Sequence, residues 1–131
     1  MRRLPPSSDS MKSALYQQLA RVAQALSSDS RLHLLEYVAQ TERSVEELAT
    51  MTGLSIANCS KHLQALRQTG LVLARKEGLR VYYGLAGNDV ATLLASLRSV
   101  AENRVAEVER LLYAWLAHRD ELVDQAADAL R

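Results

Sequence analysis

Apolar residues recur at spacings of three and four along most of the chain, which is the period of an amphipathic helix. One such stretch covers residues 11–26 and a second covers residues 32–40, with the polar run Ser27–Ser30 between them. Within that run, Ser28 or Asp29 can cap the second helix by accepting a hydrogen bond from its free amides. Both prolines lie within the first six residues, so none interrupts a later helix. The pattern predicts a mostly helical protein.

Capping signals then predict two short helices joined by a tight turn. Ser44 and Glu47 have the spacing of a capping box, in which each side chain accepts a hydrogen bond from the other residue's backbone, and this helix runs to about Met51. Gly53 suits the left-handed conformation that ends a helix, and Ser55 can cap the next helix directly. Two short helices that meet at such a turn indicate a helix-turn-helix.

The second of these helices extends from Ser55 to about Thr69 and closes at Gly70. We expect its apolar stripe to face the core, and the residues of this stripe are Ile56, Cys59, Leu63 and Leu66. After Gly70 the period changes to two over residues 71–76 and 80–85, with a turn at Gly78, which predicts a hairpin with a charged tip.

A long helix follows, because Asn88 and Asp89 offer caps and apolar residues then step by three or four from Val90 to Trp115. Residues 119–122 interrupt the pattern. We therefore expect a disordered tail over residues 1–10, one domain over 11–118, and a tail or short helix over 119–131. The fold class is mainly α with a small β-hairpin wing (α+β).

Length and composition narrow the class of protein further. The 131 residues are 48% hydrophobic and 24% charged, which is typical of one soluble domain. The formal net charge is only +1, but residues 55–84 contain five Lys and Arg against one acidic residue. A charge concentrated in this way favours a surface that binds phosphates.

The single cysteine, Cys59, excludes a disulfide within the chain and the paired thiols of a zinc finger, and it favours a reducing compartment. No stretch has the apolar core of a signal peptide or the roughly 20 apolar residues that would span a bilayer. We therefore expect a cytoplasmic protein that does not bind membranes.

Catalytic and metal-binding chemistry is not indicated. The sequence has no glycine-rich phosphate loop and no nucleophile elbow, and His33, His62 and His118 fall on different predicted elements. A metal site needs several converging ligands, and only scattered candidates exist. We expect neither an enzyme nor a bound cofactor.

Double-stranded DNA is the partner that explains most of these features, because the second helix of a helix-turn-helix enters the major groove. Asn and Gln can pair both edges of adenine, and Lys can donate to guanine or to phosphate. The cations of the hairpin tip suit the adjacent DNA backbone or minor groove. The expected DNA-contacting residues are Ser55, Asn58, Ser60, Lys61, His62, Gln64, Arg75, Lys76 and Arg80.

Three of these interpretations have simpler alternatives. Lys61 and Gln64 have the spacing of an ordinary solvated helix face. His62 is either a DNA contact or a packing residue. Cys59 is either a thiol sensor or, as its place on the apolar stripe favours, a small core residue with a raised pKa.

Several motifs together resemble the ArsR/SmtB family of bacterial transcriptional repressors. The resemblance covers about residues 15–118, and the segments that carry it are residues 48–55 (LATMTGLS), 60–63 (SKHL), 70–72 (GLV), 75–78 (RKEG) and 80–83 (RVYY). Within the family, residues 55–58 (SIAN) and 62–64 (HLQ) look most like the regulator half of proteins fused to a C-terminal rhodanese sulfurtransferase domain. The chain ends about where such a linker would begin, so it either stands alone or is part of a longer fusion.

The resemblance implies a winged helix-turn-helix homodimer, paired through the first and last long helices, that represses transcription from a palindromic operator. The usual metal sites of the family are missing. Ser44 and Glu46 stand where metal-sensing members carry two cysteines, and Asp89 lacks the histidine that follows it in others. Family members that sense oxidants through two cysteines are also no guide to the inducer, because this chain has only Cys59.

The inducer therefore stays open between three options: an apolar small molecule or partner at the dimer interface, modification of Cys59 by a reactive-sulfur or oxidant effector, or no inducer. The alternative function is a dimerisation or docking module for a protein partner such as a sulfurtransferase.

Overall fold

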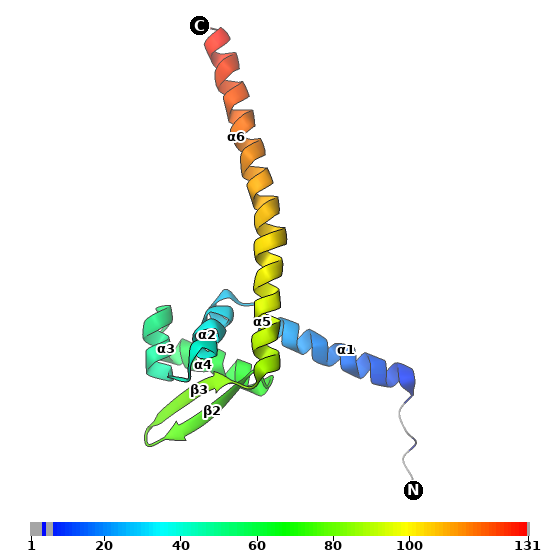
Figure 1. The fold of residues 1–131 in the computed structure, drawn as a ribbon, viewed down its shortest axis with the longest axis vertical. Helices are drawn as coiled ribbons and strands as arrows, with labels where there is room; N and C mark the ends of the chain where they lie inside the picture. Colours follow the sequence, from blue (N-terminus) through cyan, green and yellow to red (C-terminus); the bar gives the residue numbers. More distant parts are fainter. Residues whose placement is uncertain (1–3, 5–6, 131) are drawn as a thin grey trace. The chain divides into compact units, whose positions relative to one another are not determined.

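The computed structural model describes residues 4 and 7–130 and divides into two compact units, residues 1–91 and residues 92–131. It is mostly helical with one small antiparallel sheet, as the sequence predicts (Figure 1). In chain order the elements are α1 (Ser8–Ala25), α2 (Asp29–Gln40), β1 (Arg43–Ser44), α3 (Val45–Thr52), α4 (Ile56–Gln68), β2 (Val72–Glu77), β3 (Arg80–Leu85), α5 (Asn88–Val100), the π-helical turn η1 (Ala101–Val105) and α6 (Ala106–Ala129).

The capping predictions around the helix-turn-helix are confirmed. Both hydrogen bonds of the Ser44–Glu47 capping box are present at the start of α3. Gly53 ends α3 in the left-handed region with φ of 76°, which an L side chain adopts only at a cost. Ser55 then caps α4, since its Oγ accepts a hydrogen bond from the Asn58 amide at 3.1 Å. The turn between α3 and α4 is therefore defined by local chemistry at both of its ends.

Two expected boundaries differ from the structure. Helix α1 begins at Ser8, because the Ser7 hydroxyl accepts a hydrogen bond from the Ser10 amide, so residues 8–10 are helical and not part of a disordered tail. Helix α6 continues past Arg119 to Ala129, because the three charged residues 119–121 do not break a helix that needs no buried face there. Residues 1–3, 5–6 and 131, which belong to the expected tails, lie outside the described residues.

The sheet has three strands in the order β1-β3-β2, one more than the expected hairpin. Strand β2 pairs with β3 from Val72↔Leu85 to Glu77↔Arg80, and β1 adds Arg43↔Tyr83 and Ser44↔Tyr82 on the other edge of β3. Two residues are too few to show the alternation that identifies a strand. Strand β1 ties the start of α3 to the hairpin.

Helix α4 packs its apolar stripe into the core of residues 1–91. Cys59, Leu63 and Leu66 are fully buried. They share the core with residues of α2, α3 and the hairpin, among them Leu34, Leu35, Val38, Leu48, Leu71, Val72 and Tyr83. The prediction is wrong for Ile56, which is 58% exposed because it lies in the first turn of α4, beyond the edge of the core.

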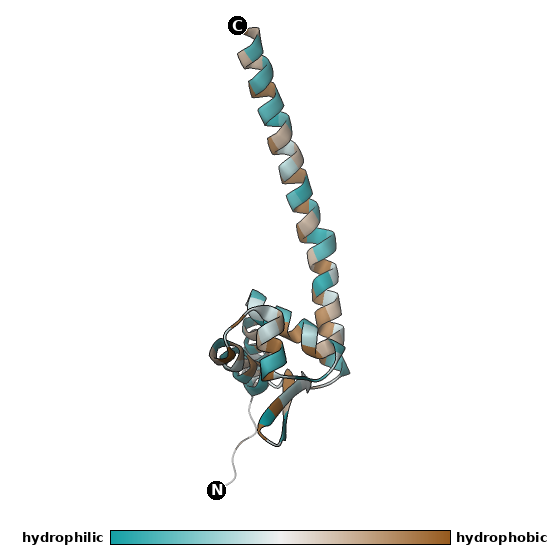
Figure 2. Cartoon of the chain, turned by 90° about the vertical axis from the view of Figure 1, so that its left-hand side faces the viewer, coloured by the Kyte–Doolittle hydropathy of each residue, from teal (hydrophilic) through white to brown (hydrophobic). Residues whose placement is uncertain are grey.

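Residues 92–129 are helical, and none of the described residues of the second unit is buried. Apolar and polar positions alternate along this helix (Figure 2). The large apolar residues exposed on it include Leu97, Val100, Val105, Val108, Leu111, Leu112 and Trp115. None of the described helices has the length and apolar character needed to cross a bilayer.

Truncation of the α4 stripe tests the importance of this packing. We expect Leu63→Ala to lower the free energy of unfolding by about 2–5 kcal/mol, the usual cost of a cavity in a core. The matched control is Leu79→Ala at the fully exposed hairpin turn, which should change it by less than about 0.5 kcal/mol. Urea denaturation followed by circular dichroism measures both, and equal effects of the two substitutions would contradict the assigned core.

Candidate nucleic-acid interface

The face of α4 opposite its buried stripe is polar and accessible. Asn58, Lys61 and Gln64 are exposed, while Ser60 is half-buried at the margin of this face. Within the described part of the chain, the side chains of Asn58 and Lys61 make no hydrogen bond or ion pair. Their donors and acceptors are therefore available to the edges of bases, and a helix in the major groove presents such groups to them.

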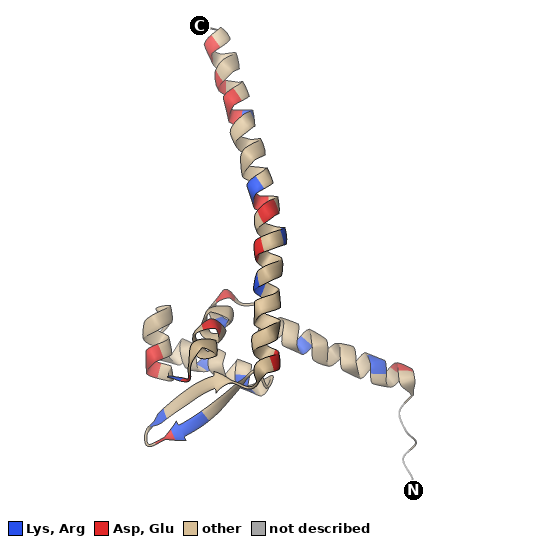
Figure 3. Cartoon of the chain, viewed as in Figure 1, with Lys and Arg blue, Asp and Glu red and all other residues tan. Residues whose placement is uncertain are grey.

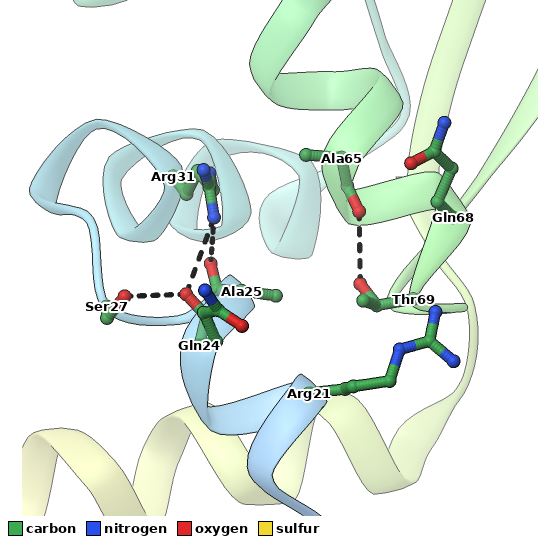
Figure 4. Close-up of a pocket in the computed structure, with 8 residues that line it drawn as sticks. All are labelled: Arg21, Gln24, Ala25, Ser27, Arg31, Ala65, Gln68 and Thr69. Atoms are coloured by element: carbon green, nitrogen blue, oxygen red, sulfur yellow. Dashed lines mark hydrogen bonds between the residues drawn. The ribbon is translucent and has the colours of Figure 1, made fainter. Parts of the chain in front are cut away.

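His62 is half-buried and bonded within the protein. Its Nδ1 accepts a hydrogen bond from Nε of Arg31 at 3.3 Å. The same guanidinium donates through Nη1 to the carbonyl oxygens of Gln24 and Ala25 at the end of α1 (Figure 4). Arg31 thus connects α1, α2 and α4, and His62 has the packing role that was one of its two interpretations. A DNA contact through its other ring nitrogen stays a prediction.

Gln64 also has a partner inside the molecule. Its side-chain amide donates a hydrogen bond to the Tyr83 hydroxyl at 3.4 Å. Tyr83 belongs to β3 and is 2% exposed. This bond therefore joins the centre of α4 to the hairpin, although it is longer than a typical hydrogen bond, and a base contact by Gln64 stays a prediction.

The hairpin β2–β3, which we call the wing, carries the remaining predicted cations near its tip (Figure 3). The turn between its strands has Gly78 with a positive φ of 61°. Lys76 and Arg80 are exposed, and their side chains make no ion pair with any residue that the structure describes. Arg75, in contrast, forms ion pairs with Glu42 and Glu77.

These features match the bacterial regulatory protein arsR family, whose model covers residues 28–73. The HTH-type transcriptional regulator Rv0081 of Mycobacterium tuberculosis is 37% identical over an alignment of 102 residues that covers 74% of this chain and 90% of that protein. The chain belongs to the ArsR family. A second regulator of M. tuberculosis, Rv0324, is 50% identical over 97 residues, which are 74% of this chain but only 43% of that protein.

A solved structure shows the same fold. The homodimeric winged helix-turn-helix DNA-binding domain of Mb0332 from Mycobacterium bovis, a fragment of residues 1–100 described as a possible ArsR-family regulator, has a TM-score of 0.71 and 48% sequence identity. The match covers 77% of this chain and 93% of the fragment. The wing and the helix-turn-helix of this ArsR-family chain are thus shared with a DNA-binding domain, and the relatives named above are transcriptional regulators.

A polar pocket of about 360 Å³ lies beside the C-terminal end of α4, between α1 and α2 (Figure 4). Arg21, Arg31, Gln68 and Thr69 are among the residues that line it. Because this pocket is polar, it does not suit an apolar small molecule, which is one of the three options for the inducer. Among the described residues, no group of three or more His, Cys, Asp and Glu side chains is placed to hold a metal ion.

Cys59 is fully buried, and its Sγ lies 3.8 Å from the carbonyl oxygen of Val45. Desolvation by burial raises the pKa of the thiol. A raised pKa lowers the thiolate fraction at neutral pH, and the thiolate is the form that reacts with oxidants and persulfides. The packing interpretation of Cys59 therefore fits the structure better than the sensor interpretation.

Two residues beside the predicted set have positions that bear on DNA binding. Ile56 is the exposed apolar residue at the start of α4. The sequence does not indicate its exposure, because its spacing places it on the core stripe. Glu42 reaches the wing from the loop after α2. No periodicity marks an acidic loop residue that pairs with a cation 33 positions later.

Burial makes the reactivity of Cys59 a test of its role. We expect iodoacetamide to modify native Cys59 at least about tenfold more slowly than Cys59 in urea, because the reaction requires opening of the core. Since the pKa is raised, the native rate should still be rising with pH at values where the unfolded rate has levelled off. Mass spectrometry gives both rates, with Cys59→Ser as the blank. Equal native and unfolded rates would restore the sensor interpretation.

Proposed function

We propose that the chain acts as a homodimer that binds a palindromic DNA operator through α4 and the wing and represses transcription in the cytoplasm. The observation that carries the proposal is the exposed polar face of α4, where Asn58 and Lys61 have no side-chain partner among the described residues, together with the wing cations Lys76 and Arg80, which form no ion pair there. The homodimeric state of the Mb0332 domain supports the symmetric arrangement. Two copies of α4 about 34 Å apart would read two half-sites one turn of DNA apart.

The dimer is proposed to form through α1 and the long helix that begins at α5. Exposed apolar residues on α1, Met11, Leu15, Tyr16 and Leu19, are 54–59% exposed. Apolar surface on this scale is usually covered by another molecule. A two-fold interface buries the same surface on both copies.

The inducer is proposed not to be a metal at the usual family positions, since Ser44 and Glu46 stand in place of the two cysteines. The likeness of residues 55–64 to regulators fused to a sulfurtransferase makes such an enzyme a candidate protein partner and a reactive sulfur species a candidate effector. Operator affinity before and after polysulfide treatment, with Cys59→Ser as control, tests the effector. Equal affinities in all samples would exclude it.

Selection of bound duplexes from a random pool tests the function itself. We expect the recovered DNA to contain inverted half-sites with centres about 10 base pairs apart. Sedimentation of the free protein should give a dimer. A monomer at working concentrations, or a pool without an enriched motif, would contradict the proposal and favour the docking alternative.

Substitutions on the wing and on α4 should differ in kind. Lys76→Gln should weaken binding to all duplexes alike and reduce the log-log salt slope by about 0.9, because it removes one phosphate contact. Lys61→Gln should instead change which bases are selected. Fluorescence anisotropy over a salt series measures the slopes. A changed base preference for Lys76→Gln, with an unchanged slope, would contradict this division of roles.

Ile56 is expected to contact a thymine methyl group, since the first residues of a recognition helix meet base edges and apolar side chains pack on that methyl. Replacing the contacted thymine of the selected half-site by uracil should weaken native binding about fourfold, because burying one methyl group is worth about 0.8 kcal/mol. The Ile56→Ala variant should bind the thymine duplex and the uracil duplex with equal affinity. Uracil outside the half-site is the control, and equal sensitivity of both proteins would exclude the contact.

A further inference from the structure

Among the described residues, Arg75 is the one predicted DNA contact of the wing whose guanidinium donates a hydrogen bond from each of its three nitrogens. Its Nε and Nη2 donate to Oε1 of Glu42 at 3.0 and 2.5 Å, and its Nη1 donates to Oε2 of Glu77 at 2.6 Å. The guanidinium also lies over the ring of Tyr82 at 4.9 Å. Two carboxylates and an aromatic face thus surround this cation.

Glu42 reaches Arg75 by crossing the strand between them. The register Arg43↔Tyr83 places Glu42 beside Gly84 of β3, while Arg75 lies on β2 at the far side of β3. A Cβ on Gly84 would meet Cγ of Glu42 at 3.9 Å, which shows that the Glu42 side chain passes over this bare position. The pair therefore connects the loop before β1 with the outer strand of the wing.

Side-chain alternation along β2 separates Arg75 from Lys76. Lys76 shares its side of the hairpin with Val72 and Tyr83, which are buried against the core that contains α4. Arg75 points to the opposite side, together with Glu77 and Tyr82. Of these two neighbouring cations, only Lys76 projects from the side of the wing that faces α4.

We propose that Glu42 is a positioning residue for DNA binding: it holds the wing in place through Arg75, and Arg75 binds carboxylates and not a DNA phosphate. The proposal rests on the proposed function and corrects the role that the sequence assigns to Arg75. The positive surface on the side that faces α4 is then formed by Lys61 and Lys76, while Arg80, which lies opposite Glu77 in the register, projects from the Arg75 side at the tip of the wing.

The ion pair between Glu42 and Arg75, which we call the latch, is a stable contact that contributes little to the stability of the whole fold. The Arg75 hydrogen bond lowers the pKa of the Glu42 carboxyl, and the same bonds raise the pKa of Arg75, so the pair stays charged at neutral pH. Both side chains are about half exposed, so the effect on global stability is small. A wing that is already positioned loses less conformational freedom when it binds DNA.

Hydrogen exchange tests the latch without DNA, and therefore separately from the proposed function. In the full chain, Glu42→Gln and Arg75→Gln should each make the amides of residues 72–85 exchange about two- to fivefold faster. The double variant should exchange no faster than either single variant, since both remove the same interaction. Glu46→Gln, an exposed acidic residue on α3, is the charge-matched control and should leave the wing unchanged.

Binding to the selected duplex tests the consequence. Removing an acidic residue usually strengthens binding to DNA, and Glu46→Gln should do so slightly. We expect Glu42→Gln instead to weaken binding about two- to fivefold, the range of exposed ion pairs. Its salt slope, and that of Arg75→Gln, should stay within about 0.3 of the native value, since no phosphate contact is lost.

Two binding results would overturn the positioning role of Glu42. If Glu42→Gln binds more tightly with a steeper salt slope, Glu42 competes with DNA for Arg75, and the positioning role is overturned. The same conclusion follows if Arg75→Gln lowers the slope by about 0.9, as a phosphate contact would. Unchanged exchange of the wing in both single variants would exclude the latch whatever the DNA result.

Discussion

The burial of one side of α4 is the constraint on which the rest of the proposed DNA-contact surface depends. Cys59, Leu63 and Leu66 occupy the core completely, so rotation of the helix about its axis would expose apolar surface and bury Lys61. Moving a charged group into such a core costs far more than any single contact on the surface returns. The orientation of the polar face is thus fixed by residues that never meet DNA.

Side-chain bonds then attach this helix to its neighbours. Arg31 holds His62 from α2, and Gln64 meets Tyr83 of the wing. The wing itself is linked to the loop before β1 by Arg75 and Glu42. The polar residues that the sequence predicts to contact DNA therefore divide into two groups: those that bond to other parts of the protein and those without such a bond among the described residues. Only the cations of the second group add to the attraction for phosphates.

The sequence predicted the elements well because their determinants are local. Caps such as Ser44 and Ser55 act within three residues, and the spacing of the α4 stripe is visible in one window. It failed where the determinant is distant or positional. Strand β1 exists only through pairing with β3, the Glu42–Arg75 contact joins separate segments, and Ile56 has core spacing but lies past the end of the core. The π-helical turn η1 left no mark in an apolar spacing that continues at three and four.

The exposed apolar surface argues for symmetry independently of DNA. The core of residues 1–91 buries the inner sides of α2, α3 and α4, but Leu15 and Leu19 of α1 remain more than half exposed, as do Val105 and Val108 of the second unit. Helices with unburied apolar positions gain stability by packing against another helix, and a second identical copy supplies the same surface. A symmetric pair presents two copies of α4 related by a two-fold axis. On this argument, the inverted repeat expected in the operator reflects where the chain is apolar as much as how α4 reads bases.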